Sequence, residues 1–327
     1  MVSKHSQDKV QIIICSYNRA MQLEALLDSI RRLWTKTPYE LVVLYETSSD
    51  EYERAYEILK GEYPEFQIIR RQKCWPLYPL RNYFKRYNLS LLYSNPKVRF
   101  QPSNVRPLIN DILKNTDCKY CMFSSDDEEF LEEVDIKDYL KLIDRDTSLY
   151  LSKGNVPGKK ETIAEGKEIL RWDKSEFSYH NWGYRFDFDV SVMLTEKVYE
   201  LLSDIIYNNP STLEADVSWY CHLKNQMRYG VAIPRYVALN HRLNLVQDNF
   251  KNKAVGVPAE NFNKRFLEGY RLRYMSPQNQ EGSFDYPEQV FFIKDGEQKA
   301  VTTQTPPYAN EQAGKGKTWR CGDVPSV

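Results

Sequence analysis

Four consecutive acidic residues, Asp126, Asp127, Glu128 and Glu129, follow the apolar run YCMF at residues 120–123 after two serines. An apolar run of this length predicts a buried strand. In an open α/β sheet, the carboxyl ends of the strands border the crevice in which ligands bind. The run therefore predicts that these four carboxylates lie in a ligand crevice.

Two interpretations of the acidic cluster stay open. Neighbouring carboxylates repel one another unless a cation lies among them, and Mg²⁺ or Mn²⁺ prefers carboxylate oxygens and commonly bridges to a diphosphate. This interpretation indicates a metal-assisted nucleotide site. Asp and Glu are also favoured in the first turn of a helix, and the acidity continues through Glu132 and Glu133. The second interpretation is therefore the solvated start of a surface helix.

Strand and helix patterns alternate along the first half of the chain. Residues 10–15, VQIIIC, and 40–45, ELVVLY, predict buried strands, and residues 66–69 predict a third. Apolar residues recur at helical spacing over 20–33, and a second helix is expected to run to about residue 60. Strands that alternate with helices are typical of parallel sheets with right-handed crossovers. We expect an α/β fold with a mostly parallel, Rossmann-like central sheet and helices on both faces.

Composition and missing motifs exclude several classes of protein. The chain contains neither GxGxxG nor GxxxxGKS, which argues against a dehydrogenase or a P-loop NTPase. Lys plus Arg equals Asp plus Glu at 45 each, so no overall field favours nucleic acid. The apolar runs are only strand-sized and the first nine residues are polar, so we expect a cytoplasmic protein. The six cysteines suit reduced core thiols.

Later segments predict a helix at 103–115, strands at 148–151 and 189–193, helices at 195–206 and from Pro210, and a strand at 231–238. Periodicity is lost after residue 247. We expect one domain over 1–248, with a nucleotide-binding half at 10–130 and an acceptor-binding half at 131–248. An irregular, partly helical extension follows at 249–327, with a disordered tail.

The segment 251–273 has basic residues with aromatic and aliphatic residues between them. A basic amphipathic helix is typical of peripheral binding to the inner face of a membrane. It could equally pack on the domain or form a homodimer contact, and these alternatives stay open.

Five segments, in this order, resemble the nucleotide-sugar-dependent glycosyltransferases of the GT-A fold, in particular bacterial members distantly similar to family 2. IIICSYNRA resembles the opening strand and nucleobase loop, LVVLYETSSD the second strand, and CMFSSDDEEF the metal-binding Asp-x-Asp motif. LEADVSW resembles the acidic acceptor helix and LNHRLNLVQ the late histidine loop. The resemblance covers about residues 10–248.

The resemblance implies a nucleotide-binding set. Tyr17 would stack on or flank the nucleobase, with Ser16 and Arg19 near the nucleotide. Recognition of base or ribose would fall to Glu46 or to its neighbour Thr47. Polar or basic contacts to nucleotide or sugar are implied at two further positions, Asn104 and Arg106.

The resemblance also implies a metal site. Asp127 would coordinate Mn²⁺ or Mg²⁺ bridging the diphosphate, with Asp126 and Ser125 toward the ribose and the metal shell. The sequence departs from a strict Asp-x-Asp, since it offers Ser125-x-Asp127 or Asp126-x-Glu128, so the identity of the metal-binding carboxylate stays open. His241 would be a further metal ligand, or else a structural hydrogen bonder.

The implied activity is transfer of a sugar, from a UDP-sugar first, to a glycan or lipid-linked acceptor. The acceptor hydroxyl needs a general base, for which Asp216 and then Glu214 are the candidates in an inverting displacement. Both could instead be surface acids of an amphipathic helix. A sugar nucleotidyltransferase and a catalytically inactive nucleotide- or sugar-binding protein are the alternative functions.

Overall fold

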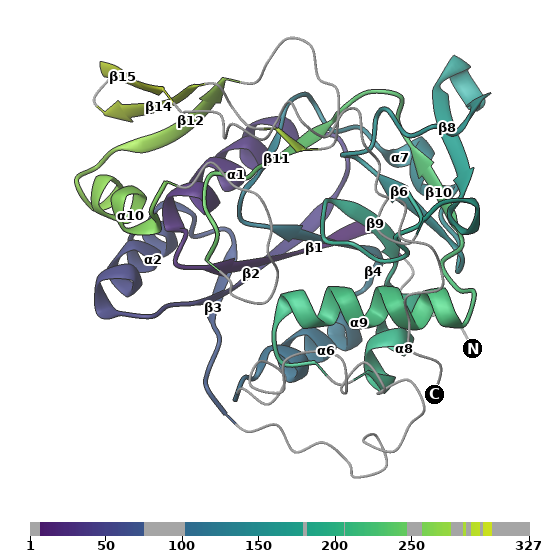
Figure 1. Ribbon diagram of the computed structural model, residues 1–327, viewed down its shortest axis with the longest axis horizontal. Coiled ribbons are helices and arrows are strands. Elements are labelled where there is room, and N and C mark those ends of the chain that lie inside the picture. The colour runs from purple at the N-terminus through teal and green to yellow at the C-terminus, as the bar shows by residue number, and fades with distance from the viewer. Residues whose placement is uncertain are drawn as a thin grey trace.

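The computed structural model describes residues 7–74, 102–178, 182–205, 207–246, 257–275, 284–285, 289–294 and 297–302. Its main feature is a nine-stranded sheet of order β3-β2-β1-β4-β9-β6-β10-β8-β7 (Figure 1). The strands are β1 (Gln7–Tyr17), β2 (Tyr39–Glu46), β3 (Gln67–Arg70), β4 (Cys118–Ser125), β6 (Thr147–Tyr150), β7 (Lys159–Thr162), β8 (Glu168–Asp173), β9 (Ser191–Leu194) and β10 (Tyr229–Ala232).

Strand directions place several chain segments at one edge of this sheet. Strands β3, β2, β1 and β4 are parallel to one another. Strand β9 is antiparallel to both β4 and β6, and β10 is parallel to β6. The carboxyl ends of β1, β2, β4 and β6 therefore meet at the same edge as the start of β9. A ligand crevice is expected at this edge.

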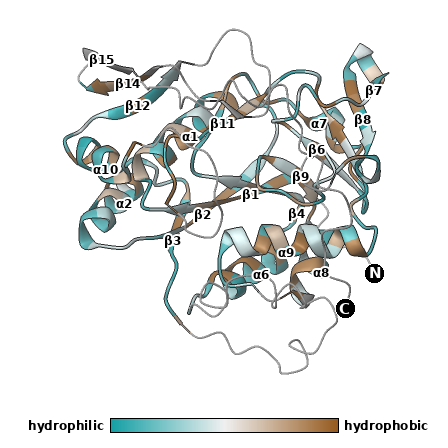
Figure 2. Ribbon diagram, viewed as in Figure 1, coloured by the Kyte–Doolittle hydropathy of each residue, from teal (hydrophilic) through white to brown (hydrophobic). Residues whose placement is uncertain are grey.

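Helices cover both faces of the sheet, as predicted (Figure 1). One face packs on α1 (Ala20–Leu33), α2 (Asp50–Glu62) and α10 (Ala259–Leu267), and the other on α6 (Val105–Asn115), α8 (Thr195–Asp204) and α9 (Pro210–Leu223). Strand β1 supplies both cores, because Ile12 and Ile14 face the first and Ile13 and Cys15 the second. Figure 2 shows the resulting hydrophobic colour along β1 and β2. The predicted α/β fold is confirmed.

The prediction of a helix start at the acidic cluster is wrong. After a turn at Asp126 and Asp127, the chain forms a short strand, β5 (Glu128–Phe130), which pairs antiparallel with β11 (Ala238–His241). Phe130 enters the core and Glu128 is 1% exposed, so the segment is too buried to be a solvated helix turn. The next helix, α7 (Lys137–Leu140), begins only later. The single strand predicted at 231–238 is likewise two strands, β10 and β11.

The extension after residue 248 is more regular than predicted. Strands β12 (Arg271–Met275), β14 (Gln289–Lys294) and β15 (Glu297–Thr302) form an antiparallel sheet, and β13 (Phe284–Asp285) pairs with β11. In the segment 251–273, α10 covers only Ala259–Leu267, and its Phe262 and Phe266 are buried in the core, which matches the packing alternative. The division at residue 248 stays a prediction.

The prediction of a disordered tail concerns residues 303–327, which lie outside the described ranges. Within the described ranges, no helix is both long and apolar enough to cross a membrane. Five of the cysteines are described there, all as free thiols; four are buried, and Cys74 is exposed.

At Gly154, the loop after β6 passes very close to the backbone of Arg235. A Cβ at this position would lie 2.3 Å from the backbone carbonyl carbon of Arg235, whereas a Cβ at Gly61, in α2, would meet nothing within 4 Å. We predict that Gly154→Ala lowers the free energy of unfolding by about 1–3 kcal/mol, as overpacking does. Gly61→Ala is the matched control and should raise it by about 0.5–1 kcal/mol, because alanine is the better helix former. Urea unfolding measures both, and equal effects of the two variants would contradict the close approach.

Candidate active site

A buried arginine lies at the centre of the carboxyl edge. Arg19 Nη1 donates to Asp126 Oδ1 and to Asp127 Oδ2, each at 2.9 Å. Its Nε donates to Asn244 Oδ1 at 2.7 Å, and its Nη2 to the backbone oxygen of Asn244. Arg19, Asp126, Asp127 and Asn244 are all less than a tenth exposed. The cation expected within the acidic cluster is thus supplied, at least in part, by a side chain of the protein.

The loop after β1 holds this arrangement in place. Asp126 Oδ2 also accepts from Ser16 Oγ at 2.7 Å and from the Tyr17 backbone nitrogen at 3.2 Å. The Tyr56 hydroxyl lies 2.5 Å from Ser16 Oγ and accepts from the Arg19 backbone nitrogen. The structure therefore brings together Ser16, Tyr17, Arg19 and both aspartates.

Asp127 is also held from β11. Its Oδ1 accepts from Asn240 Nδ2 at 3.2 Å, and its backbone oxygen accepts from the His241 nitrogen at 2.6 Å. The His241 ring is fully buried, lies with Nε2 3.0 Å from Glu129 Oε2, and stacks on Tyr274 at 3.8 Å between centroids. Glu129 thus engages Nε2, and both the structural role and metal ligation of His241 stay predictions.

Asn240 was not predicted from the sequence. Its side chain is 5% exposed, and its Oδ1 has no hydrogen-bond partner among the residues that the structure describes. The same amide nitrogen also bonds Ser125 Oγ at 3.2 Å. A buried acceptor without a partner costs about 1–3 kcal/mol, which indicates a place for a donor or a cation.

The ends of β2 and β3 form the next part of the edge. Asn18, at φ 57°, donates to Ser48 Oγ at 2.8 Å and so ties the β1 loop to the β2 loop. Thr47 Oγ1 donates to Glu53, whereas Glu46 lies 3.4 Å from the Arg71 guanidinium. Arg71 is 6% exposed, and its Nε has no partner within the described ranges. Sequence reasoning missed Arg71, although a basic residue right after a predicted strand was a visible signal.

Two residues that the resemblance places near the nucleotide or sugar, Arg106 and Asn104, form hydrogen bonds with other parts of the protein. Arg106 donates from Nε to the Ile205 oxygen at 3.1 Å and from Nη2 to the Ser203 oxygen at 3.0 Å. Its guanidinium therefore satisfies carbonyls at the end of α8, where cations are favourable. Asn104 Oδ1 accepts from the Gln72 nitrogen at 2.7 Å and fixes the chain after β3. Nothing in this geometry favours a nucleotide role for Arg106.

A second group of carboxylates precedes β9. Asp187 Oδ2 lies 2.5 Å from Lys153 Nζ, in a pair that is buried on both sides. Glu214 Oε1, from α9, accepts from the Phe188 nitrogen at 3.2 Å, and Asp216 is buried on the same helix. In the segment 186–189, FDFD, aromatic residues alternate with aspartates. No site residue was predicted from this pattern.

Burial and mutual repulsion raise the pKa values of these acids. Burial, followed by the charges of Asp189 and Asp187, raises the pKa of Glu214 to about 8. Burial and then Asp187 raise the pKa of Asp189 to about 6. Ser124 Oγ donates to Glu128 Oε2 at 2.5 Å, and burial together with the charge of Asp189 raises the pKa of Glu128 well above the ordinary value. Glu214 and Glu128 therefore hold their protons to higher pH than free glutamates do.

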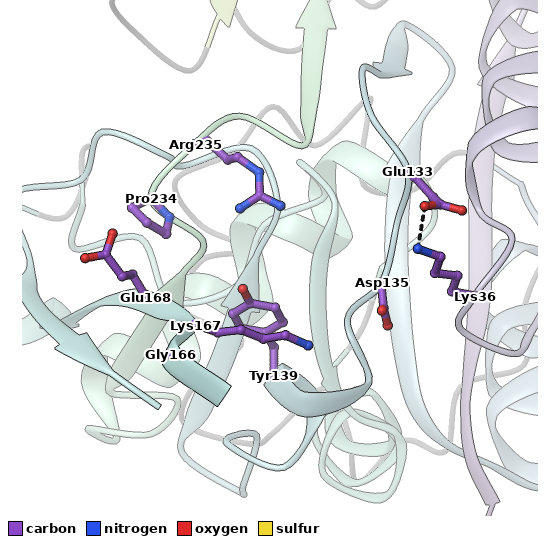
Figure 3. A pocket seen from close by; sticks show the side chains of 9 residues that line it. All are labelled: Lys36, Glu133, Asp135, Tyr139, Gly166, Lys167, Glu168, Pro234 and Arg235. Carbon is purple, nitrogen blue, oxygen red and sulfur yellow. Dashed lines mark ion pairs between the residues drawn. The ribbon is translucent and has the colours of Figure 1, made fainter. Parts of the chain in front are cut away.

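A hollow of about 540 Å³ lies apart from these residues (Figure 3). Charges of both signs line it, and its Lys36 and Glu133 form an ion pair at 2.6 Å. None of the predicted site residues lines it. A further group, Glu40, Asp117 and Cys118, could hold a metal ion by spacing, but Lys9 already pairs with Glu40 at 2.6 Å. The predicted site residues therefore lie outside this hollow.

The raised pKa of Glu214 predicts a pH dependence of stability. Because its folded pKa lies near 8 and the ordinary value is 4.5, the folded state keeps a proton that the unfolded state has lost between these pH values. Stability should therefore fall as pH rises from 5 to 8. Glu214→Gln should make the fall in melting temperature over this range smaller, and the exposed Glu57→Gln should leave it unchanged. An equally steep fall in Glu214→Gln would contradict the assignment.

No family model and no curated protein matches the chain. Solved structures similar to it include TarS 1–349 of S. aureus, with 17% identity and a TM-score of 0.40 over 70% of this chain and 59% of that chain. The complex of TarS 1–349 with UDP-GlcNAc gives 15% identity and a TM-score of 0.40 over 79% of this chain and 65% of that chain. The complex with UDP gives 16% identity and a TM-score of 0.39. The chain spans about three fifths of the TarS 1–349 structure.

Proposed function

We propose that the protein is a glycosyltransferase that moves a sugar from a nucleotide-diphosphate donor, a UDP-sugar first, to a glycan or lipid-linked acceptor. The observation that carries the proposal is the buried Arg19 group with Asp126 and Asp127 at the carboxyl edge of a parallel sheet. Buried ionised groups are costly and are kept where geometry matters. This group has the chemistry of a site for a charged, polar ligand.

The β2 and β3 ends support a uracil nucleotide. Uracil presents carbonyl acceptors beside an N–H donor. Arg71, whose Nε has no partner among the described residues, lies next to the Glu46 carboxylate and would offer the matching donor and acceptor. Tyr17 and Ser16 adjoin Asp126, the carboxylate proposed to lie toward the ribose. Thr47 would contribute through the β2 loop.

A divalent ion fits this site at Asp127. Arg19 supplies one positive charge against two carboxylates, which leaves one negative charge for a dication. The acceptor atoms beside it are Asp127 Oδ1 and the partnerless Asn240 Oδ1, both hard oxygens of the kind Mg²⁺ and Mn²⁺ prefer. A bound ion would stabilise the charge that develops on the leaving diphosphate. Ligation by His241 is not supported, since its Nε2 faces Glu129.

The α9 side of the crevice would hold the acceptor. The resemblance assigns the base to Asp216 or Glu214, and both lie on α9 beside the segment before β9. With a pKa of about 8, Glu214 is mostly protonated at neutral pH and is the weaker candidate of the two. An inverting displacement follows if one carboxylate deprotonates the acceptor hydroxyl directly.

Thermal shifts with nucleotides test the proposal. UDP, GDP, CDP, dTDP and ADP are compared with and without Mn²⁺ on the wild type, Asp127→Ala and Asp127→Asn. At hundredfold excess over the dissociation constant, a ligand that binds only the folded state stabilises it by about 2.7 kcal/mol. We expect a Mn²⁺-dependent shift with UDP that both Asp127 variants lose.

The two Asp127 variants control for stability, because asparagine keeps a polar partner for the buried Arg19 where alanine does not. The exposed Asp111→Ala should keep the full shift. If no nucleotide shifts the wild type under either metal condition, the glycosyltransferase proposal fails. If the Asp127 variants kept the Mn²⁺-dependent shift, Asp127 would not be a ligand of the ion.

A further inference from the structure

One carboxylate at this edge, that of Asp189, differs from its neighbours in having no partner among the residues that the structure describes. Each of the others is engaged by a described residue: Asp126 and Asp127 by Arg19, Glu128 by Ser124, Glu129 by His241, Asp187 by Lys153, and Glu214 by the Phe188 nitrogen. Asp216 is buried and engaged as well. The Asp189 carboxylate forms no hydrogen bond or ion pair with any residue that the structure describes.

The backbone around Asp189 is held firmly. Its nitrogen donates to Asp187 Oδ1 at 3.2 Å, and its oxygen accepts from Ser152 Oγ at 2.8 Å. The next residue, Val190, has φ 45°, a conformation that β-branched residues rarely adopt. Such a conformation costs on the order of 1–3 kcal/mol and persists only where surrounding contacts impose it. Asp189 is thus presented from a rigid turn at the start of β9.

Strand pairing places Asp189 at the carboxyl edge. Strand β9 pairs antiparallel with β4, with Ser191 opposite Phe123, so Asp189 lies just before β9 at the edge where β4 ends. Its carboxylate interacts with the charges of Asp187, Asp127, Lys153 and Arg242. Burial, Asp187 and Asp127 raise its pKa to about 6, so it is more basic than a free aspartate. A base is most effective when its pKa lies near the working pH.

A second observation places a ligand in the same crevice. Asn240 is more than nine-tenths buried, and its amide bonds Asp127, yet its Oδ1 has no partner within the described ranges. This atom points to a ligand on the Asp127 side. Asp127 follows β4 and Asp189 precedes β9 at the same edge of the sheet, so Asp189 and Asn240, which bonds Asp127, belong to one site.

We propose that Asp189 is the catalytic base of the transfer, in place of the α9 acids; this rests on the proposed function. The acceptor hydroxyl gives its proton to the Asp189 carboxylate while its oxygen forms a bond to the anomeric carbon of the donor. The bond from that carbon to the diphosphate oxygen breaks, and its electron pair leaves with UDP. Lys153 and Asp187 act as positioning residues, since they hold the loop that presents Asp189.

Hydrolysis of the donor tests the assignment without a known acceptor, because the same base would activate water. UDP-glucose, UDP-galactose, UDP-GlcNAc and UDP-GalNAc are offered to the wild type, Asp189→Asn, Asp216→Asn and Glu214→Gln, and UDP binding is measured by thermal shift on each. We expect Asp189→Asn to lower kcat for hydrolysis at least about 100-fold, the usual range for a lost base. Its KM and its UDP shift should stay within about threefold.

Asp135→Asn, in the hollow of Figure 3, is the matched control and should hydrolyse at the wild-type rate. Unchanged hydrolysis in Asp189→Asn, with loss in Asp216→Asn, would return the base to α9 and overturn the proposal. Binding of UDP without hydrolysis of any donor by the wild type would also overturn it while leaving nucleotide binding intact. If the wild type neither bound UDP nor hydrolysed any donor, the proposed glycosyltransferase function itself would be wrong.

Discussion

The buried guanidinium of Arg19 organises the crevice. It joins the loop after β1 to the end of β4 and to Asn244, residues more than a hundred positions apart in the chain. A buried ion pair of this kind adds little stability over apolar packing, but removing one partner costs about 3–5 kcal/mol, since an uncompensated charge remains. The three segments are therefore held in one arrangement.

This arrangement divides the crevice into two halves of different character. On the β1, β2 and β3 side, Asp126 is saturated by donors and the Glu46 and Arg71 pair offers a planar edge. On the β9 and α9 side, acids outnumber the cations near them, and their pKa values are raised. A polar nucleotide suits the first half, and proton transfer from an acceptor suits the second.

Much of the fold followed from local patterns. The VQIIIC and ELVVLY runs and the helical spacing between them predicted β1, β2, α1 and the layered sheet, because burial on both faces leaves a strong signal in sequence. The acidic cluster was correctly placed at a strand end. Its continuation as a helix was wrong, because pairing of β5 with β11 overrides the helical preference of the acids.

The site was predictable only where its residues lie in one loop. Arg71, Lys153, Asp189 and Asn240 come from four separate elements, and their roles depend on contacts that spacing does not encode. Arg106 illustrates the converse, since its position suggested a ligand contact but the nearby end of α8 offered carbonyls that its guanidinium satisfies.

Location of the nucleotide and the ion would test the account most directly. Crystals of the protein grown with UDP and Mn²⁺ would give an anomalous difference peak for manganese. The account predicts one peak within coordination distance of Asp127 and Asn240, with the uracil against Glu46 and Arg71. Manganese bound at Glu40, Asp117 and Cys118, or UDP bound in the hollow of Figure 3, would contradict it.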